Sequence, residues 1–510
     1  MRSGQLGAAA ALVLGFAASV PLIGADSVAK LSEAIQRGDR QAVRALLARP
    51  AEVRAIDADG TTPLHWAVQA DDVELVHALL KAGARAHVAN RYGASPLSLA
   101  AVNGNAAVVD ALLGAGALAD AVVSRGQTVL MTAARTGNPA VVAKLLDKGA
   151  DVNAREEQQG ETALMWAASE NHAAVVRLLT SRGAAVNVRS KTLTFPKDRF
   201  GLEGVLTILP KGSWTPLMYA ARDGAPDATT ALLAAGAEMN ATDPDGTTPL
   251  VRAIWNSHYD TARVLVEAGA NPNLVDSAGM GALYAAVDMS SLGEVYGMPL
   301  RKVKDATTPL DLIALLLSNG AEVDARLKSA AMQRNHTPGE PQLGAGTTPL
   351  MRAARNGDHR AMRLLLDKGA DGKAMQANGT TVLMLASGVG RGLGVFAKDY
   401  ATEAELLEAV KVALVQGSQV NAATTNGLTA LHYAAQAGMD SIVSELARNG
   451  ARLDAKDKQG RTPIDVALGV GNRGRAGGPP AVFPKTAELL KQLMADPPVR
   501  SAGPGPLARP

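Results

Sequence analysis

Apolar and small residues occur along this chain in blocks, and their spacing within each block fits a short helix. Pairs such as Val141-Val142 and Leu145-Leu146 are spaced so that they share one face of a helix. Pairs of alanine, for instance Ala133-Ala134 and Ala167-Ala168, precede such blocks and would keep a helix thin enough for close neighbours. The pattern predicts an all-α fold of short, closely packed helices.

The blocks belong to one phrase that recurs along the chain. It reads Gly-x-Thr-Pro-Leu, two further residues, Ala-Ala, and then a Val- and Leu-rich stretch that ends in Gly-Ala. The copies start at Thr62, Ser95, Thr128, Thr162, Thr215, Thr248, Gly281, Thr348, Thr381, Thr429 and Thr462. Six of the ten steps between these starts are 33 residues and a seventh is 34. A repeat array explains how 510 residues can fold without several separate cores, because each unit packs only on its neighbours.

Each unit is predicted to be helix, turn, helix and loop. The Thr hydroxyl can cap the first helix, and Pro fits the first turn because its missing N–H has no partner there anyway. A glycine follows each second helix, where a left-handed C-cap favours it. These glycines are Gly83, Gly116, Gly149, Gly183, Gly236, Gly269, Gly320, Gly369 and Gly450.

Repeated this often, the phrase closely resembles that of the ankyrin repeat family, over about residues 28–494. The resemblance implies an ankyrin-repeat solenoid of about eleven helix-turn-helix units, with short hairpin loops and an N-terminal capping pair. The copies at Gly281 and Thr381 lack the proline, and we expect those two units to be looser.

The repeats also predict the boundaries along the chain. We expect a signal peptide over 1–25, capping helices over 26–58, repeats over 59–187, 213–325 and 347–494, and a disordered tail over 495–510. Insertions are expected at 188–212, 288–309, 326–346, 388–402 and 469–484. The first and third fall between repeats, and the other three fall between the two helices of one repeat.

Four of the five phenylalanines lie in these insertions: Phe195, Phe200, Phe396 and Phe483. Each either fixes its own loop to the scaffold or contacts a partner, and we favour the first interpretation because large exposed apolar patches are uncommon.

The family resemblance implies a concave groove lined by the first helices and the hairpin tips. The groove positions fall two, five and six residues after the Leu of the motif. The candidate partner-binding residues are Trp66, Tyr92, Arg135, Trp166, Trp214, Tyr219, Arg222, Arg252, Trp255, Arg352, Arg355 and Tyr433. Trp, Tyr and Arg are the residue types enriched at binding hot spots.

For Trp66 and Trp166, packing between neighbouring first helices explains the residue as well as partner binding does. Arg252 and Arg352 are harder to explain as core, because charged groups are seldom buried without a partner.

Motifs for catalysis or metal binding are not found. The chain has no Cys, and its eight His form no HExxH motif or close pair; His65 and His432 match structural positions of the repeat. Asp57-Ala58-Asp59-Gly60 and Asp243-Pro244-Asp245-Gly246 resemble calcium loops, but Trp66 and Arg252 stand where the closing Glu belongs. Gly469 to Gly474 matches GxGxxG but follows a predicted helix, not a strand. We therefore expect no cofactor, no metal and no enzyme activity.

The net charge of the chain and its N-terminal segment indicate which partners and which cellular location to expect. A net charge of +3 with dispersed basic residues gives no footprint for nucleic acid. Arg2, the apolar run from Gly7 to Ser19 and Ala25 before a cut predict a cleaved signal, hence a periplasmic or secreted protein without membrane insertion after cleavage. The alternative is an uncleaved anchor, but the run is short for a bilayer span. The composition suggests a bacterium.

The expected function is a scaffold that binds a protein partner through the groove, as a monomer by family resemblance. The alternatives are an enzyme whose pocket is built from the groove and the insertions, or a binder of a small molecule such as a peptidoglycan fragment.

Overall fold

The structure, a computed structural model, describes residues 30–193, 211–290, 305–329, 342–391, 401–471 and 481–498. The expected signal peptide, most of the tail and the centres of all five insertions, with Phe195, Phe200 and Phe396, lie outside the described residues. The chain divides into two compact units. The smaller unit comprises the described residues 30–100 and 110–117, and the larger unit comprises 101–109 and the described residues from 118 to 498.

Short helices open the described chain. They are α2 (Leu31–Gln36), α3 (Arg40–Leu47) and α4 (Pro50–Val53), so the expected capping pair has a third, single-turn helix. Asp39 caps α3 by accepting hydrogen bonds from the backbone N–H groups of Gln41 and Ala42.

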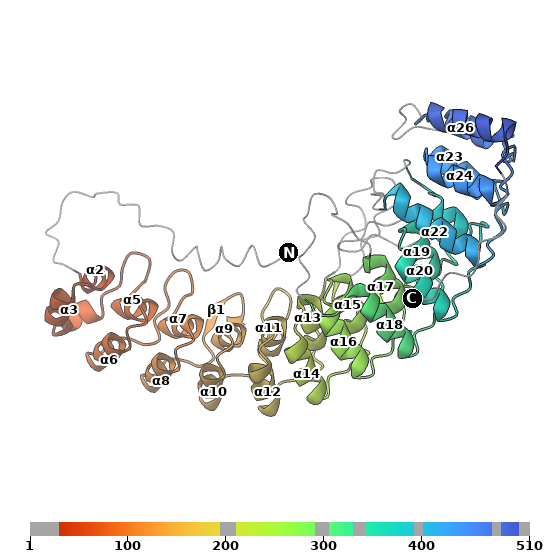
Figure 1. The fold of residues 1–510 in the computed structure, drawn as a ribbon. Helices are drawn as coiled ribbons and strands as arrows, with labels where there is room; N and C mark the ends of the chain where they lie inside the picture. The colour runs from red at the N-terminus through yellow and green to blue at the C-terminus, as the bar shows by residue number, and fades with distance from the viewer. Residues whose placement is uncertain are drawn as a thin grey trace, which may run out of the picture. The chain divides into compact units, whose positions relative to one another are not determined.

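Helix pairs form most of the remaining described chain, and the all-α fold is confirmed. The first helices of the pairs are α5 (Pro63–Gln69), α7 (Pro96–Asn103), α9 (Val129–Thr136), α11 (Ala163–Ser169), α13 (Pro216–Asp223), α15 (Pro249–Trp255), α17 (Ala282–Ser290), α19 (Pro349–Arg355), α21 (Val382–Ala386), α23 (Ala430–Gln436) and α25 (Pro463–Ala467). The second helices are α6 (Val73–Lys81), α8 (Ala106–Gly114), α10 (Pro139–Asp147), α12 (Ala173–Ser181), α14 (Pro226–Ala234), α16 (Tyr259–Glu267), α18 (Pro309–Ser318), α20 (His359–Asp367), α22 (Glu403–Val415), α24 (Asp440–Arg448) and α26 (Pro484–Ala495). In the larger unit, α9, α11, α13 and α15 form one row and α10, α12, α14 and α16 a second row beside it (Figure 1).

The motif Thr caps the first helices as the sequence predicts. The Thr215 hydroxyl accepts the backbone N–H of Met218 at 3.4 Å, and Thr248 accepts that of Val251 at 3.3 Å. The same motif also begins a second helix: Thr308 caps α18 at the N–H of Asp311, whose carboxylate accepts in return from Thr308. Thr-Pro-Leu alone therefore marks a helix start and does not say which helix of the pair begins.

The core lies between neighbouring pairs and consists of small and aliphatic side chains. In the larger unit, α11 contacts α9 and α13, and α12 contacts α10 and α14. Ala134, Ala167 and Ala220 on the first helices are fully buried, as are Leu145 and Leu179 on the second helices. The alanines let the first helices approach one another, while the leucines fill the space behind them.

Residues with a left-handed backbone conformation end the helices of the repeat units. The glycines predicted after the second helices have positive φ, for example +87° at Gly149 and +88° at Gly236. A second left-handed position lies in the turn between the two helices of a pair. It is Gly137 (+90°), Asn171 (+60°) and Gly224 (+73°) in three successive repeats. These angles turn the chain sharply enough to lay the two helices antiparallel.

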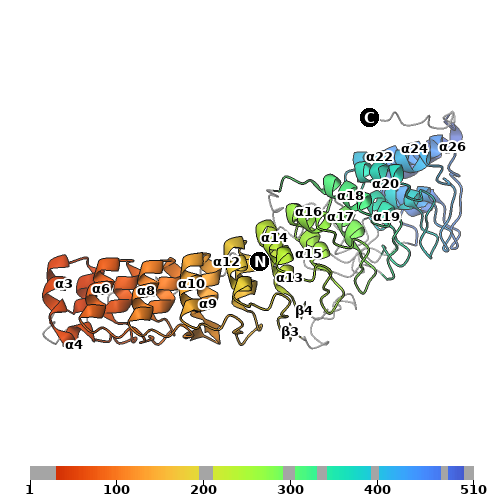
Figure 2. The ribbon, with the colours of Figure 1, turned by 90° about the horizontal axis from the view of Figure 1, so that it is seen from below.

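Two short antiparallel hairpins occur in the described chain. β1 (Val122–Ser124) pairs with β2 (Gln127–Thr128), and β3 (Thr192–Leu193) pairs with β4 (Lys211–Gly212). Thr192 faces Gly212 and Leu193 faces Lys211, which brings together the two described ends of the 188–212 insertion beside α13 (Figure 2). This insertion therefore leaves the scaffold from a hairpin.

Three other insertions connect the first helix of a pair to its second helix. Their described ends lie between α17 and α18, between α21 and α22, and between α25 and α26. Phe483, at the end of the last of these, packs against Gly438, because a Cβ built on that glycine would lie 2.3 Å from the phenyl ring. For Phe483, the expectation that it fixes its own segment to the scaffold is confirmed.

Within the described residues, no helix is both long enough and apolar enough to cross a membrane.

Candidate functional site

The predicted binding residues occupy two recurring positions of the first helices. Six follow the motif Leu by two residues: Trp66, Trp166, Tyr219, Arg252, Arg352 and Tyr433. Four follow it by five: Arg135, Arg222, Trp255 and Arg355. Positions three apart share one face of the same helix, so the two positions lie together on each first helix. Trp214 and Tyr92 lie in the turns that precede first helices.

Arg135 and Trp166 form the first contact of this face in the larger unit. The Cζ of Arg135 is 5.7 Å from the centre of the Trp166 ring, and its Nε is 3.6 Å from Glu170 Oε1. The indole Nε1 of Trp166 donates to Glu161 Oε2 at 2.9 Å. Both Arg135 and Trp166 are half-buried, so the indole is held in place and still has accessible surface.

Trp214, Tyr219 and Arg222 meet on α13. The rings of Trp214 and Tyr219 are 5.6 Å apart in an edge-to-face arrangement. The Cζ of Arg222 is 5.3 Å from the Trp214 ring centre and 4.9 Å from that of Tyr219. Half-buried Trp214 and Arg222 thus lie over a buried tyrosine, and cation–π attraction fixes their relative orientation.

Burial controls the ionisation of this group. It raises the pKa of Tyr219 above its usual range, and the charge of Glu161 adds to the effect. Burial alone would lower the pKa of Arg222, but hydrogen bonds and charge from Asp223 outweigh it and the pKa is raised. Tyr219 is therefore neutral and Arg222 charged at neutral pH.

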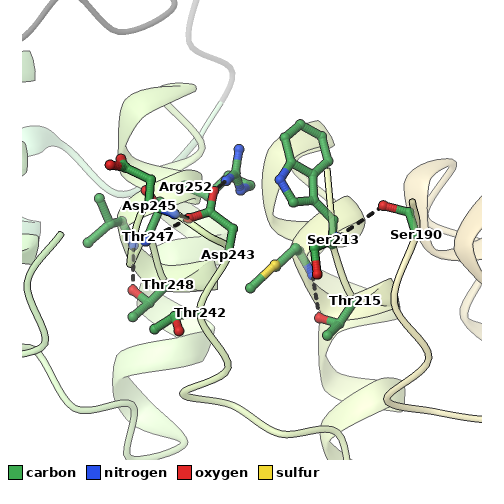
Figure 3. Close-up of polar contacts among 12 residues, drawn as sticks. Ser190, Ser213, Thr215, Thr242, Asp243, Asp245, Thr247, Thr248 and Arg252 are labelled. Carbon is green, nitrogen blue, oxygen red and sulfur yellow. Dashed lines mark hydrogen bonds and ion pairs between the residues drawn. The ribbon is translucent and has the colours of Figure 1, made fainter. Parts of the chain in front are cut away.

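Arg252 is buried, with 4% of its surface exposed, and it pairs with Asp243 (Figure 3). Its Cζ lies 4.1 Å from the centre of the Trp214 ring, so Trp214 contacts arginines of two repeats. Burial lowers the pKa of Arg252 to about 10, with the charge of Arg222 adding to the shift and Asp243 opposing it. The side chain is still protonated at neutral pH.

Trp255, Arg352 and Arg355 are also buried, each with at most 6% of its surface exposed. Arg352 Nη2 lies 2.5 Å from Oδ1 of Asp288, itself buried on α17. The expectation that Arg252 and Arg352 are hard to accommodate in a core is therefore wrong, because each has a buried carboxylate partner. These side chains present little surface, and a direct contact between them and a partner stays a prediction.

Trp66 and Tyr92 belong to the smaller unit. Trp66 is half-buried and its Nε1 donates to Asp57 Oδ2 at 3.1 Å. Tyr92 is 59% exposed at a hairpin tip, with Arg91 Cζ 4.8 Å from its ring centre. Tyr433, near the C-terminal end of the array, is half-buried, and burial raises the pKa of its hydroxyl.

Carboxylates that orient these side chains are the residues that sequence reasoning missed. Asp57 binds Trp66 and Asp243 binds Arg252, in both cases nine residues along the chain. The signal was present, because these aspartates open the two Asp-x-Asp-Gly turns, and Trp66 and Arg252 stand where a calcium loop has its closing Glu. The first Asp of each turn instead accepts a hydrogen bond from that aromatic or cationic side chain.

His65 and His432 have structural roles, as predicted. Nδ1 of His65 accepts the backbone N–H of Thr62 at 3.1 Å, and Nε2 lies 3.0 Å from the carbonyl oxygen of Ala94 in the next repeat. His432 makes the equivalent contacts with Thr429 and Arg461. Among the residues that the structure describes, no three His, Asp or Glu side chains are grouped so that they could hold a metal ion.

Stacked helix-turn-helix units with capped first helices and hairpin turns define a helical repeat protein. A family model described as ankyrin repeats (3 copies) matches residues 31–123, 116–190, 201–276, 306–392 and 399–474, and the chain belongs to the ankyrin repeat family.

Individual relatives each match only part of the array. Human cyclin-dependent kinase 4 inhibitor B is 34% identical over 145 residues, which are 28% of this chain and 94% of that protein. A transient receptor potential cation channel subfamily A member 1 homolog of Caenorhabditis elegans is 30% identical over 122 residues, 24% of this chain but only 9% of the channel protein. The solved ankyrin repeat domain of Bcl-3 is 28% identical, with a TM-score of 0.36 over 44% of this chain and 94% of that one.

Proposed function

We propose that this chain is a non-catalytic scaffold that binds a protein partner through the first-helix face of its larger unit. The observation that carries the proposal is the half-buried pair Arg135 and Trp166, beside Trp214 and Arg222. Binding hot spots are enriched in Trp, Tyr and Arg, and this face has all three in contact with one another.

Pre-organisation strengthens the proposal. Trp166 is fixed by a hydrogen bond to Glu161, and the ring of Trp214 contacts both Arg222 and Arg252. Side chains that are already ordered lose less conformational entropy when a partner binds. The match to kinase inhibitors, whose names describe proteins that act on another protein, supports the same function.

A capture experiment tests the proposal. The tagged full chain would be crosslinked in an extract of its native source, beside the variants Trp166→Ala and Arg135→Ala, which alter half-buried side chains. The matched control is Arg177→Ala, which alters an exposed side chain of α12, the second helix of the same repeat as Trp166. We expect one protein that is recovered with the wild type and the control and lost with both first-helix variants.

Equal recovery with folded Trp166→Ala would move the site away from this face. The buried residues Arg252 and Trp255 are unsuitable for this test, because their substitution would disturb folding.

We also propose that the protein acts in the periplasm or outside the cell. The support is the basic start, the apolar run and the small residues of 1–25. Mass spectrometry of the protein isolated from its source tests this. A mature N-terminus at Asp26 is the expected result, and retention of Met1 or Arg2 would contradict it.

A further inference from the structure

The capping helices at the start of the described chain carry its excess of positive charge. Basic residues occur along the whole sequence, but residues 30–56 contain six of them against three acidic residues. The resulting charge of +3 equals the net charge of the whole chain, so all other residues together are neutral. A charge excess that is confined to one segment creates a local positive field, which attracts anions to that segment.

Three arginines of this segment, Arg40, Arg44 and Arg49, have exposed side chains. Arg40 and Arg44 lie four residues apart on one face of α3. Arg49 directly precedes α4, which contacts α3 at the end of the smaller unit (Figure 2). Within the described chain, none of the three guanidinium groups forms a hydrogen bond or an ion pair. We call these residues the capping-helix arginines.

The three acidic residues of the segment are engaged elsewhere. Glu33 pairs with Arg37, with 3.1 Å between Oε2 and Nη2. Asp39 accepts two backbone N–H groups at the start of α3, and Glu52 accepts the backbone N–H of Leu31 at 3.3 Å. The capping-helix arginines are therefore left without an ionic partner from their own segment.

The placement of Arg40 and Arg44 destabilises the helix that holds them. Arg40 is the first residue of α3, where the helix dipole disfavours a positive charge. Like charges four residues apart on a helix also repel each other. Residues that break local rules without a compensating contact in the fold are typical of functional sites. The arrangement therefore indicates that an anion binds here.

The residues around these arginines decide which kind of anion fits. From 30 to 55, the described chain exposes no large hydrophobic side chain. The exposed residues beside the arginines include Ala45, Ala48, Pro50 and Ala51. Protein interfaces have a hydrophobic centre with aromatic or aliphatic anchors, which this surface lacks. A lipid bilayer needs no such anchor for electrostatic binding, and a guanidinium group matches a phosphate with two parallel N–H donors.

We propose that the capping-helix arginines bind the phosphate groups of an anionic phospholipid bilayer. The contact is electrostatic, and no segment of the chain enters the bilayer through it. Each arginine near such a surface strengthens binding by a factor of about five, and the attraction falls as salt screens it. The surface belongs to the smaller unit, whereas the proposed partner site belongs to the larger one, so each can be tested without the other.

Vesicle co-sedimentation tests the inference with the chain from Asp26, which keeps every described residue and lacks the apolar run that could bind lipid by itself. We expect it to bind vesicles of equal parts phosphatidylglycerol and phosphatidylcholine at low salt, and not to bind vesicles of phosphatidylcholine alone. The triple variant Arg40→Gln, Arg44→Gln and Arg49→Gln should bind the anionic vesicles roughly a hundredfold more weakly, because three factors of about five are lost.

The matched control removes three positive charges from exposed positions of the larger unit, by Arg177→Gln, Arg360→Gln and Arg452→Gln. It should bind like the wild type, and circular dichroism checks that both triple variants fold. Equal binding by the two triple variants, or equal binding to the two kinds of vesicle, would overturn the inference. Binding of hexaglutamate without binding of the anionic vesicles would identify an acidic protein segment as the partner and would likewise reject the membrane contact.

Discussion

The imidazole of His172 lies directly over the backbone of Gly137 in the preceding repeat. A Cβ built on Gly137 would lie 2.4 Å from Cε1 of the ring, and Nε2 of His172 donates to the carbonyl oxygen of Arg135 at 2.9 Å. The same arrangement recurs with His258 over Gly224. The glycine between two helices therefore serves a left-handed turn and also makes room for the next repeat.

Gly137→Ala should destabilise the protein more than Gly149→Ala. The two glycines have nearly equal φ, +90° and +87°, but a Cβ at Gly149 would meet nothing within 4 Å. Gly149→Ala should cost about 1–2 kcal/mol of unfolding free energy for the left-handed backbone alone. Gly137→Ala should cost about 1–3 kcal/mol more because the His172 ring must move. Urea unfolding followed by circular dichroism measures both, and equal costs would mean that the ring moves freely.

Arg252→Met should be strongly destabilising. It leaves the carboxylate of Asp243 buried beside an apolar side chain, and breaking a buried ion pair from one side costs about 3–5 kcal/mol. Arg182→Met is the control, because Arg182 and Asp147 form a similar pair at 2.7 Å that is 40% and 60% exposed. That substitution should cost about 1 kcal/mol or less. Thermal unfolding of the two variants compares them, and similar melting temperatures would contradict the prediction.

Stability should fall as the pH drops below about 6.5, the ordinary pKa of histidine. Burial lowers the pKa of His65 and of His432 in the folded state, although nearby carbonyl and carboxylate groups oppose the shift. The unfolded chain therefore binds more protons between the folded and unfolded pKa values. The contribution of the neutral imidazoles is complete above the unfolded pKa and is lost as the pH falls toward the folded value.

Ser98 supplies a matched control for His65. It occupies the same place in the next repeat, where its hydroxyl accepts the N–H of Ser95 at 2.9 Å and cannot titrate. His65→Ser should therefore keep the helix cap and flatten the pH dependence of the urea midpoint between pH 5 and 7. An unchanged slope in the double variant His65→Ser with His432→Ser would show that these histidines do not cause it.

Phe483→Ala should loosen the last helix without unfolding the array. The phenyl ring packs on Gly438 of the preceding repeat, and the backbone N–H of Phe483 donates to Ala467 of α25 at 2.7 Å, so this residue connects α26 to the first helix of its own repeat and to the repeat before it. A repeat array loses its end units most easily, because they have one neighbour instead of two. Hydrogen exchange should become faster in α26 while α9 to α16 stay unchanged. Uniformly faster exchange would contradict the local role.

The sequence determined the fold because the repeat makes its packing local. Thr248 and Pro249 start a helix, Ala253 keeps it thin and Gly269 ends the pair, and each of these effects acts within a few residues. Because these residues recur about every 33 positions, each helix pair packs on the pair before it and the pair after it. The family and the helix pairs could therefore be predicted from the sequence.

Only the tertiary structure decided which candidate residues are buried and what they touch. Arg252 and Trp166 stand at the same position of the motif, yet one is buried against Asp243 and the other is half-buried and held by Glu161. Their burial depends on Trp214, on Asp243 and on neighbouring repeats, whose side chains differ from unit to unit. Backbone geometry follows from local propensity and can be read from one repeat. Side-chain exposure and charge pairing depend on contacts between repeats, and those exist only once the units are stacked.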